Sequence, residues 1–421
     1  MKRTASPAAS RAAAAPAAPA KALRAHHPDY VLALTVTVLL AVGLVIMYSI
    51  SPILSHKLTG SADRNYYFLN QIKYILIGLG VWVAATAIPY WKWRQYAPWL
   101  MGAAIVSLVA LLVPGLSHSS HGATRWLDLG PISVQPAEIL KVALILYLAA
   151  WFERRATDVT SFWDGVVPFS IMVGISCFVI VIFQRDMGTM SVLALATLGM
   201  FFAAGIRLRH LAGLVGASVG AGALAIVAFP HRMDRLTTFL DPAKDAANTG
   251  YHINQALIAI GSGGILGLGL GRSVQVYGYL PEAANDSIFA IIAEEFGLIG
   301  SVLVLALFGF VVYRGLQVAR TAPDVFGRLV ALGISLWFLF QAVINIGAML
   351  SVVPLTGIPL PFISYGGTSL VIALFGAGIL LNISKYTVRE GSDADTRQRR
   401  GVSRPYLAGS GSLRRVKAAR T

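Results

Sequence analysis

The chain has 421 residues, of which 56% are hydrophobic and only 13% are charged. A soluble core cannot bury so much apolar surface, so the composition excludes an ordinary soluble globular protein and predicts that lipid surrounds most of the chain. The formal net charge of +15 would favour nucleic-acid binding in a soluble protein. In a membrane protein the enrichment of cytoplasmic loops in Lys and Arg explains it, and no nucleic acid is expected as a partner.

The two ends of the chain are polar and basic. Residues 1–28 are rich in Ala and Pro and predict a disordered cytoplasmic tail, because a cleavable signal peptide would place its apolar stretch nearer the start. Residues 389–421 are rich in Arg and predict a second basic cytoplasmic tail. The membrane domain is therefore expected over residues 29–388.

Between the tails, apolar runs are long enough to cross a bilayer core of roughly 30 Å, which needs about 20 helical residues. The sequence predicts an all-α polytopic membrane protein with about ten transmembrane helices. The predicted spans lie near residues 30–50, 70–89, 96–115, 135–152, 165–183, 188–206, 209–229, 287–313, 326–350 and 364–384. The fifth span holds the single cysteine, Cys177, so neither a disulfide nor a thiol zinc site can form within the chain.

The basic residues predict the orientation of these spans. The two tails and the even-numbered loops hold most of the 34 Lys and Arg residues, for example Arg154 and Arg155 after the fourth span and Arg207 and Arg209 after the sixth. The positive-inside rule therefore places both termini in the cytoplasm, and the predicted location is the cell inner membrane.

One further apolar stretch, residues 253–271, could be taken for another span. A span there would place the basic loop around Arg314 and Arg328 and the Arg-rich C-terminus outside, against the positive-inside rule. We therefore interpret the stretch as re-entrant or interfacial, with its backbone sheltered by protein. Residues 230–286 then form one long external segment between the seventh and eighth spans, and long ordered loops are where functional residues concentrate.

Glycines in this external segment resemble a nucleotide-binding loop only superficially. No strand precedes Gly261–Gly271 and no Lys-Ser/Thr pair follows, so the motif lacks its required context. Close helix packing through small residues four apart, such as Gly263 and Gly267, is the simpler interpretation. A backbone nest for a lipid pyrophosphate is the alternative.

Charged residues at membrane depth are costly and therefore tend to be paired or functional. Glu138 and Lys141 lie three residues apart on one face of the fourth span and can form an ion pair, either structural or in contact with substrate. Glu294 and Glu295 lie two turns into the eighth span, so at least one of them must point into the bundle.

Three residues in the external loops are candidates for chemistry. Arg125 and Arg185 can bind phosphate oxygens through two N–H groups at once, although an interfacial Arg is also an ordinary membrane anchor. Asp286 lies where the long external segment enters the eighth span. A carboxylate at this boundary can act as a general base, and capping of the helix N-terminus is the competing interpretation.

Five segments of the chain form recognisable signatures. They are Gly122–Trp126 with Gln135–Glu138 and Lys141, Gln184–Thr189, Phe239–Pro242 with Gly250–Tyr251 and Ala259–Gly264, Leu280–Ala290, and Pro354–Gly367. Together they resemble the signatures of the FtsW/RodA (SEDS) family: Leu280–Ala290 is similar to the catalytic loop of that family, and Pro354–Gly367 is similar to its highly specific C-terminal signature. The resemblance covers roughly residues 30–385.

This resemblance implies a peptidoglycan glycosyltransferase that polymerises lipid II on the outer face of the inner membrane. It implies that Asp286 is the catalytic base, and the substrate-binding candidates are Arg125, Glu138, Lys141, Arg185 and Ser364. No metal ligand cluster is predicted, although a divalent cation, Mg or Mn, could share in stabilising the pyrophosphate. The implied partners are a class B penicillin-binding protein transpeptidase and other divisome membrane proteins.

The chain departs from the family pattern around Asp286. Ala284 and Asn285 replace the usual His-Thr pair, and Ser287 replaces an aromatic residue. In the second signature Arg185 replaces a proline. The long basic tails favour an FtsW-type role in septal synthesis over a RodA-type role in elongation. A lipid II flippase, which would not need Asp286 as a base, is the alternative from another functional class, and a scaffold of the division machinery is a third.

Overall fold

The computed structural model describes residues 25–59, 64–113, 115–120, 123–128, 130, 133–155, 159–241 and 249–386. The chain divides into a unit of residues 1–387 and a unit of residues 388–421, and every described residue belongs to the first unit. The predicted tail 389–421 and nearly all of the predicted tail 1–28 lie outside the described residues, so their character stays a prediction.

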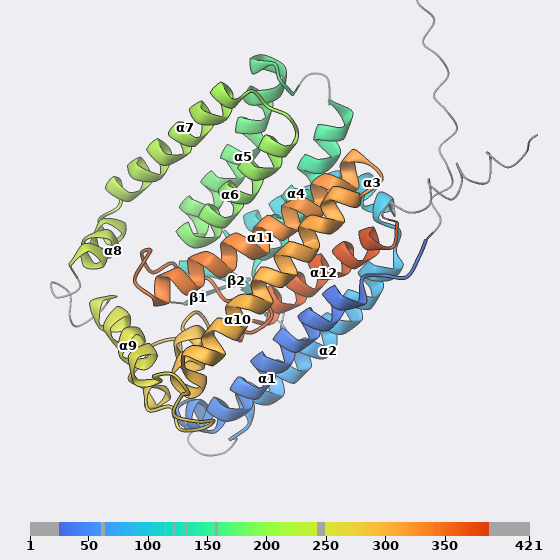
Figure 1. The fold of residues 1–421 in the computed structure, drawn as a ribbon. Helices are drawn as coiled ribbons and strands as arrows, with labels where there is room; N and C mark the ends of the chain where they lie inside the picture. The colour runs from blue at the N-terminus through green and yellow to red at the C-terminus, as the bar shows by residue number, and fades with distance from the viewer. Residues whose placement is uncertain are drawn as a thin grey trace, which may run out of the picture. The chain divides into compact units, whose positions relative to one another are not determined.

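Each of the ten predicted spans corresponds to a helix (Figure 1). The fifth span is α5 extended at both ends by π-helical turns, η1 (Phe162–Val166) and η2 (Ile180–Gln184). The ten helices are α1 (Tyr30–Thr59), α2 (Tyr66–Ala87), α3 (Tyr90–Ala110), α4 (Pro136–Arg154), α5 (Val167–Val179), α6 (Met187–Ala203), α7 (Leu208–Val227), α10 (Ile288–Thr321), α11 (Val325–Met349) and α12 (Gly367–Ser384).

Among the described residues, seven helical stretches are both long enough and apolar enough to cross a membrane. Of the other three helices, α6 is apolar but has 17 residues. α3 and α4 have 21 and 19 residues and carry charged side chains. The predicted helical, multi-pass membrane fold is confirmed.

The centre of the bundle is formed by α11 and α12, which are the most deeply buried of the long apolar helices. α2 packs along α12, while α4, α6 and α10 pack along α11. Small residues allow the closest approach: a Cβ atom on Gly378 would lie 2.8 Å from the Trp82 carbonyl oxygen of α2. Such backbone contact between helices is how membrane bundles gain van der Waals energy when lipid supplies no hydrophobic drive.

The first and last helices meet at one end of the bundle. The backbone N–H of His26 donates to the carbonyl of Lys385 at 2.8 Å, and the N–H of Asp29 donates to Ser384 Oγ at 3.0 Å. The chain therefore enters and leaves the bundle at the same end, as an even number of crossings requires. We call this end the terminal end.

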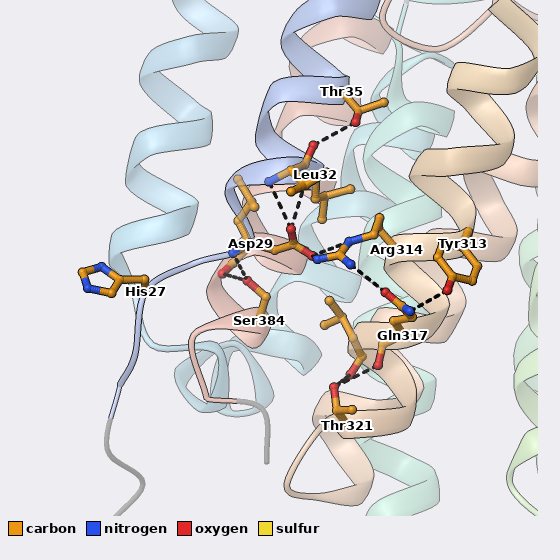
Figure 2. Close-up of polar contacts among 12 residues, drawn as sticks. His27, Asp29, Leu32, Thr35, Tyr313, Arg314, Gln317, Thr321 and Ser384 are labelled. Carbon is orange, nitrogen blue, oxygen red and sulfur yellow. Dashed lines mark hydrogen bonds and ion pairs between the residues drawn. The ribbon is translucent and has the colours of Figure 1, made fainter. Parts of the chain in front are cut away.

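The terminal end is fastened by a polar cluster around Asp29 (Figure 2). One Asp29 oxygen caps α1 by accepting the N–H groups of residues 31 and 32, and the other accepts from Arg314 Nε at 2.8 Å. Arg314 also donates to Gln317, which in turn donates to the Tyr313 hydroxyl. This cluster ties the start of α1 to the last third of α10.

The long segment 230–286 contains two short helices, α8 (Pro230–Leu240) and α9 (Thr249–Ser262). At a rise of about 1.5 Å per residue, neither their 11 nor their 14 residues can span a bilayer core. The apolar stretch 253–271 leaves helical geometry after Ser262 and continues as turns as far as a 3₁₀ turn, η4 (Gln275–Tyr277). The expectation that this stretch is not a further span is confirmed by its helix length.

The glycines of this stretch bring its backbone into direct contact with α10. A Cβ atom on Gly263 would lie 1.9 Å from the Ala293 carbonyl oxygen, and Gly267 adopts a φ of +81°. At Gly297 (φ +66°) the α10 backbone is not helical, and the break lets Leu298 N donate to the Gly264 carbonyl. The interpretation of these glycines as packing residues is confirmed.

Glu294 and Glu295 are both buried and fasten the same stretch to α10. Glu294 accepts from the Ser273 hydroxyl and from Val274 N at 2.9 Å. Glu295 accepts from the Ser49 hydroxyl at 2.6 Å and from Gly271 N at 3.0 Å. Each of the two carboxylates therefore accepts hydrogen bonds that hold the segment before α10 in place.

A small antiparallel sheet precedes α4, and the sequence did not predict it. Its strands, in the order β1-β2-β3, are β1 (Ser117–Ser120), β2 (Ala123–Asp128) and β3 (Ser133–Val134). β2 carries Arg125 and Trp126, so the sheet gives a fixed position to residues that were expected in an irregular loop.

Candidate functional site

A cavity of about 1090 Å³ opens at the N-terminal ends of α2, α4, α6, α10 and α12. These are the second, fourth, sixth, eighth and tenth long helices in the chain, so all of them start from the side opposite the terminal end. The sheet strand β2 and the short helices α8 and α9 complete the wall. Far-apart parts of the sequence are thus brought together at one membrane boundary.

Asp286 lies in this wall, on the turns that lead into α10. The residue is 8% exposed, and its carboxylate has one weak hydrogen bond, from the Ser287 hydroxyl at 3.5 Å. The N-cap position of α10 belongs to Ser287 and shows no side-chain cap. The interpretation of Asp286 as a helix cap is therefore wrong, and its carboxylate is available to the cavity.

The protonation of Asp286 is set mainly by its burial. Burial raises the pKa of the Asp286 carboxyl to about 7, and the negative charge of Glu282 acts in the same direction. Its hydrogen bonds and the positive charge of Arg235 oppose this rise. A carboxyl group with a pKa near neutrality can both accept and release a proton at physiological pH, as a general base must.

The Asp286 backbone is held from α11. Asn345 Nδ2 donates to the Asp286 carbonyl and to the Ile358 carbonyl, both at 2.8 Å. Tyr365 N donates to the Ala284 carbonyl at 2.9 Å. The catalytic-loop and C-terminal signatures are therefore packed against each other, with Asp286 at their junction.

Three guanidinium groups line the cavity: Arg125, Arg185 and Arg235. Arg125 donates to the carbonyls of Gln184 and Arg185, which joins β2 to the turn before α6. Burial lowers the pKa of Arg235, and so does Arg125, whereas Asp286 and Asp186 act in the opposite direction. Such a cluster suits an anionic group with several oxygens, such as a diphosphate.

A second group of lining residues is rich in tyrosine and comes mainly from the first turns of α2. Tyr66, Asn70, Lys73 and Tyr74 line it together with Tyr365. Side chains of this kind offer hydroxyl, amide and ammonium hydrogen-bonding groups on an apolar surface. The cavity lining therefore contains a guanidinium-rich group and a tyrosine-rich group, and Asp286 belongs to the same lining.

Glu138 and Lys141 are not part of the cavity lining. They form a buried ion pair, with 2.9 Å between Glu138 Oε1 and Lys141 Nζ. Lys141 Nζ also donates to Gln341 Oε1 at 2.8 Å and lies 5.1 Å from the Trp337 ring centre. Gln341 Nε2 donates to the carbonyl of Pro359, a lining residue. The pair supports the wall from behind, and a role in substrate binding stays a prediction.

Ser364 also lies behind the lining. Its hydroxyl accepts the backbone N–H of Leu360 at 2.8 Å and closes the turn that follows Pro359. Of the five predicted substrate-binding residues, the structure thus places Arg125 and Arg185 at the cavity surface and the other three in its support.

Three lining residues, Arg235, Lys73 and His252, were not predicted from the sequence. A usable signal existed for Arg235. The short helix α8 carries Arg232 and Arg235 in a segment predicted to be external, where the positive-inside rule disfavours basic residues. Lys73 and His252 gave no such signal, because their neighbours in the cavity come from distant parts of the chain.

Within the part of the chain that the structure describes, no three His, Cys, Asp or Glu side chains come together in a way that could hold a metal ion. The described lining offers cations instead, in the form of its arginines and Lys73.

Comparison with known proteins identifies the family. A family model with the description cell cycle protein, for FtsW, RodA and SpoVE, matches residues 30–389. The chain belongs to this family. The match covers the whole helical unit that carries the cavity, so every segment of the site lies within the FtsW/RodA/SpoVE region.

Two curated relatives illustrate the similarity. Stage V sporulation protein E of Bacillus subtilis (strain 168) is 38% identical over 363 residues, which cover 86% of this chain and 98% of that protein. A protein of Nitrosomonas europaea named probable peptidoglycan glycosyltransferase FtsW is 38% identical over 358 residues, which cover 84% of this chain and 92% of that protein.

Solved structures share the fold. A chain of a peptidoglycan synthase complex, in a study of how polymerization and crosslinking are coordinated, gives a TM-score of 0.69 at 27% identity and covers 85% of this chain and 97% of that chain. The rod shape determining protein RodA of Thermus thermophilus gives a TM-score of 0.63 at 26% identity. The match covers 86% of this chain and 98% of the RodA chain. The helical arrangement is thus that of FtsW/RodA/SpoVE proteins along nearly their whole length.

Proposed function

We propose that this FtsW/RodA/SpoVE protein is a peptidoglycan glycosyltransferase that polymerises lipid II on the outer face of the inner membrane. The observation that carries the proposal is Asp286, a buried carboxylate with a pKa near 7 in a cavity lined by three guanidinium groups. A general base beside a polyanion site is what transfer of a sugar from a lipid diphosphate requires. The curated relatives named FtsW support the same activity.

In the proposed reaction Asp286 accepts the proton of the acceptor sugar's 4-hydroxyl. The hydroxyl oxygen forms a bond to the anomeric carbon of the growing strand, and the bond between that carbon and the diphosphate oxygen breaks with inversion. Undecaprenyl diphosphate leaves with the bonding electrons, and Arg125, Arg185 and Arg235 stabilise its charge. Asp286 then releases its proton to water, and the cycle can begin again.

The cavity must lie outside for this reaction, and the distribution of basic residues supports that orientation. The terminal end carries Arg314, Lys385 and the start of the basic tails, which the positive-inside rule places in the cytoplasm. The cavity is formed by helix ends on the opposite side. This arrangement is the one expected of an enzyme in the cell inner membrane that uses externally exposed lipid.

For partners, we propose a class B penicillin-binding protein transpeptidase that crosslinks the new glycan, together with other divisome membrane proteins. The similarity to a chain of a peptidoglycan synthase complex supports the first. The relatives named FtsW favour a role in septal synthesis during division.

The test is polymerisation of fluorescent lipid II by the purified full-length chain with its transpeptidase partner. Asp286→Asn should reduce glycan synthesis at least hundredfold while lipid II binding persists. Asp164→Asn is the matched control, because Asp164 is exposed, far from the cavity lining and bonded to Ser161. Normal polymerisation by Asp286→Asn, or lipid II translocation without polymerisation by the wild-type protein, would contradict the proposal. The second result would indicate a flippase.

A further inference from the structure

A side chain from α9 reaches the residue next to Asp286. His252 Nε2 lies 2.6 Å from Ser287 Oγ, and Ser287 Oγ lies 2.9 Å from the Pro281 carbonyl oxygen. Ser287 is fully buried, whereas His252 lines the cavity. The contact joins two segments that are 35 residues apart in the chain.

The protons of this contact can be assigned. The Pro281 carbonyl can only accept, and at 2.9 Å it is the main acceptor of the single Ser287 hydroxyl proton; Asp286 Oδ1, at 3.5 Å, is the weaker second acceptor of the same proton. His252 must then donate to Ser287 Oγ, which places a proton on Nε2. Burial and, to a smaller extent, the positive charge of Arg235 lower the pKa of His252 to about 4, so the imidazole is neutral at pH 7. The three groups therefore form a hydrogen-bonded chain with one direction. His252 Nε2–H donates to Ser287 Oγ, and the Ser287 hydroxyl donates to the Pro281 carbonyl.

The hydrogen-bonded chain fastens the Asp286 loop from α9. Asn345 and Tyr365 hold the backbone at residues 286 and 284 from α11 and from the segment before α12. His252 holds residues 281 and 287, the two ends of the loop, through a single hydroxyl. Ser287 stands where the family pattern has an aromatic residue, so the contact with His252 depends on a position at which this chain departs from that pattern.

We propose that His252 is a positioning residue that fixes the Asp286 carboxylate through Ser287. This inference rests on the proposed glycosyltransferase activity. His252 does not itself take a proton from the substrate; it keeps the Asp286 loop in the geometry for attack and keeps water away from the carboxylate. Both effects predict a change in turnover rather than in substrate binding.

His252→Ala should lower kcat about three- to tenfold with little change in KM, as expected for loss of one hydrogen bond. Ser287→Ala should lower kcat at least as much, because it also removes the contacts with Pro281 and Asp286. The double variant should lose no more than Ser287→Ala, since Ser287→Ala already removes the bond to His252. His252→Gln should keep most of the activity, since its amide N–H can replace the Nε2 donor. His27→Ala and Ser170→Ala are matched controls outside the cavity lining.

The pH profile separates positioning from general loss of structure. Groups that act on Asp286 are Glu282, Ser287 and Arg235, and Arg235 is itself influenced by Arg125 and Asp186. None of these changes in His252→Ala. The imidazole is replaced by water, so the pKa of Asp286 should fall and the acidic limb of the rate profile should move to lower pH. His252→Gln should leave the limb in place.

Two measurements do not depend on activity. In the full-length protein, hydrogen exchange of peptides covering residues 280–287 should increase in His252→Ala and Ser287→Ala but not in His252→Gln. Carbodiimide labelling of Asp286 against pH should show a lower midpoint in His252→Ala. If polymerisation fails in the wild type but these shifts occur, the glycosyltransferase proposal is wrong and the positional link stands. If His252→Ala leaves exchange, labelling and kcat unchanged, or His252→Gln behaves like His252→Ala, the positioning role is wrong.

Discussion

Two buried carboxylates, Asp286 and Glu138, differ in what surrounds them. Glu138 is 1% exposed and forms an ion pair with Lys141, whose ammonium group is further held by Gln341 and Trp337. Asp286 is 8% exposed and has a single weak hydrogen bond to its side chain. The first carboxylate is paired with a cation through one oxygen inside the bundle, and the second lies at a cavity without such a pair among the described residues.

The difference teaches where chemistry can occur in a membrane bundle. A carboxylate with a close cationic partner is held in its charged form and serves the fold. A carboxylate that is desolvated without such a partner is destabilised when charged, and can relieve this only by taking up a proton. The close ion pair of Glu138 and Lys141 lies behind the cavity wall, and Asp286 has no such pair within the described part of the chain.

Of the changes that test the contrast between Asp286 and Glu138, removing the charge of Asp286 should have the largest effect. Asp286→Asn should lower the rate of polymerisation at least hundredfold. Above pH 7 the same variant should be more stable to unfolding than the wild-type protein. The reason is that the pKa of this carboxyl is raised from 3.8 to about 7 on folding, so the wild type loses stability as pH rises through that interval. Thermal unfolding in detergent at pH 4 and pH 8 checks the sign. Equal stability of the two proteins at pH 8 would contradict it.

Breaking the ion pair should have the opposite effect on stability. Lys141→Met leaves Glu138 buried without its cation and should cost about 3–5 kcal/mol of unfolding free energy. The control is the double variant Glu138→Gln with Lys141→Met, which removes both charges and should recover most of the loss. Denaturation in detergent measures both. If the double variant is no more stable than Lys141→Met, the pair does more than neutralise charge.

The pH dependence of the wild-type rate tests the open carboxylate directly. Asp286 must be ionised to accept a proton, so kcat/KM should rise with pH and level off above about 7. At one pH unit below the midpoint kcat/KM should be about tenfold lower than at its high-pH plateau. Initial rates between pH 5 and pH 9 provide the measurement. A profile that is flat between pH 5 and pH 7 would show that no such carboxyl group controls the reaction.

The smallest effect is expected at the terminal end, where a third carboxylate, Asp29, is paired with Arg314 at 2.6 Å. Asp29→Asn keeps an acceptor for the N-terminus of α1 but loses the ion pair. Because Arg314 is partly exposed, the cost should be about 1 kcal/mol or less, with no change in polymerisation. Thermal unfolding at low and high salt should show the difference shrink with salt. A loss of activity would indicate that the two ends of α10 are coupled.

The helices could be predicted from the sequence because a bilayer imposes a length of apolar chain that few other structures share. The positive-inside rule even excluded a span at residues 253–271, where α9 ends after 14 residues. The sheet before α4 was missed, since two of its strands are short and polar. The break at Gly297 was also missed, because it depends on the packing of Gly264 and Gly267 against α10.

For the site, the sequence placed Asp286, Arg125 and Arg185 where the cavity is. It could not distinguish them from Lys141 and Ser364, which face the interior of the bundle. Sequence spacing predicts which residues share a helix face, but not whether that face meets a cavity or another helix. Arg235 and His252 join Asp286 only through tertiary packing of α8 and α9, which a single sequence does not reveal.

The close pairing of α2 with α12 also bears on how the protein is made. Among the long helices of the described residues α2 is the second, and α12, which packs along its length, is the tenth. Asp29 and Ser384, in contact at 3.0 Å, are separated by 355 positions. During synthesis α2 must therefore wait in lipid, or with a chaperone, until α12 has been made. A chain that is truncated before Tyr365 lacks this lining residue and also lacks α12, so its helical bundle is incomplete. Such truncated products should be inactive and sensitive to proteolysis.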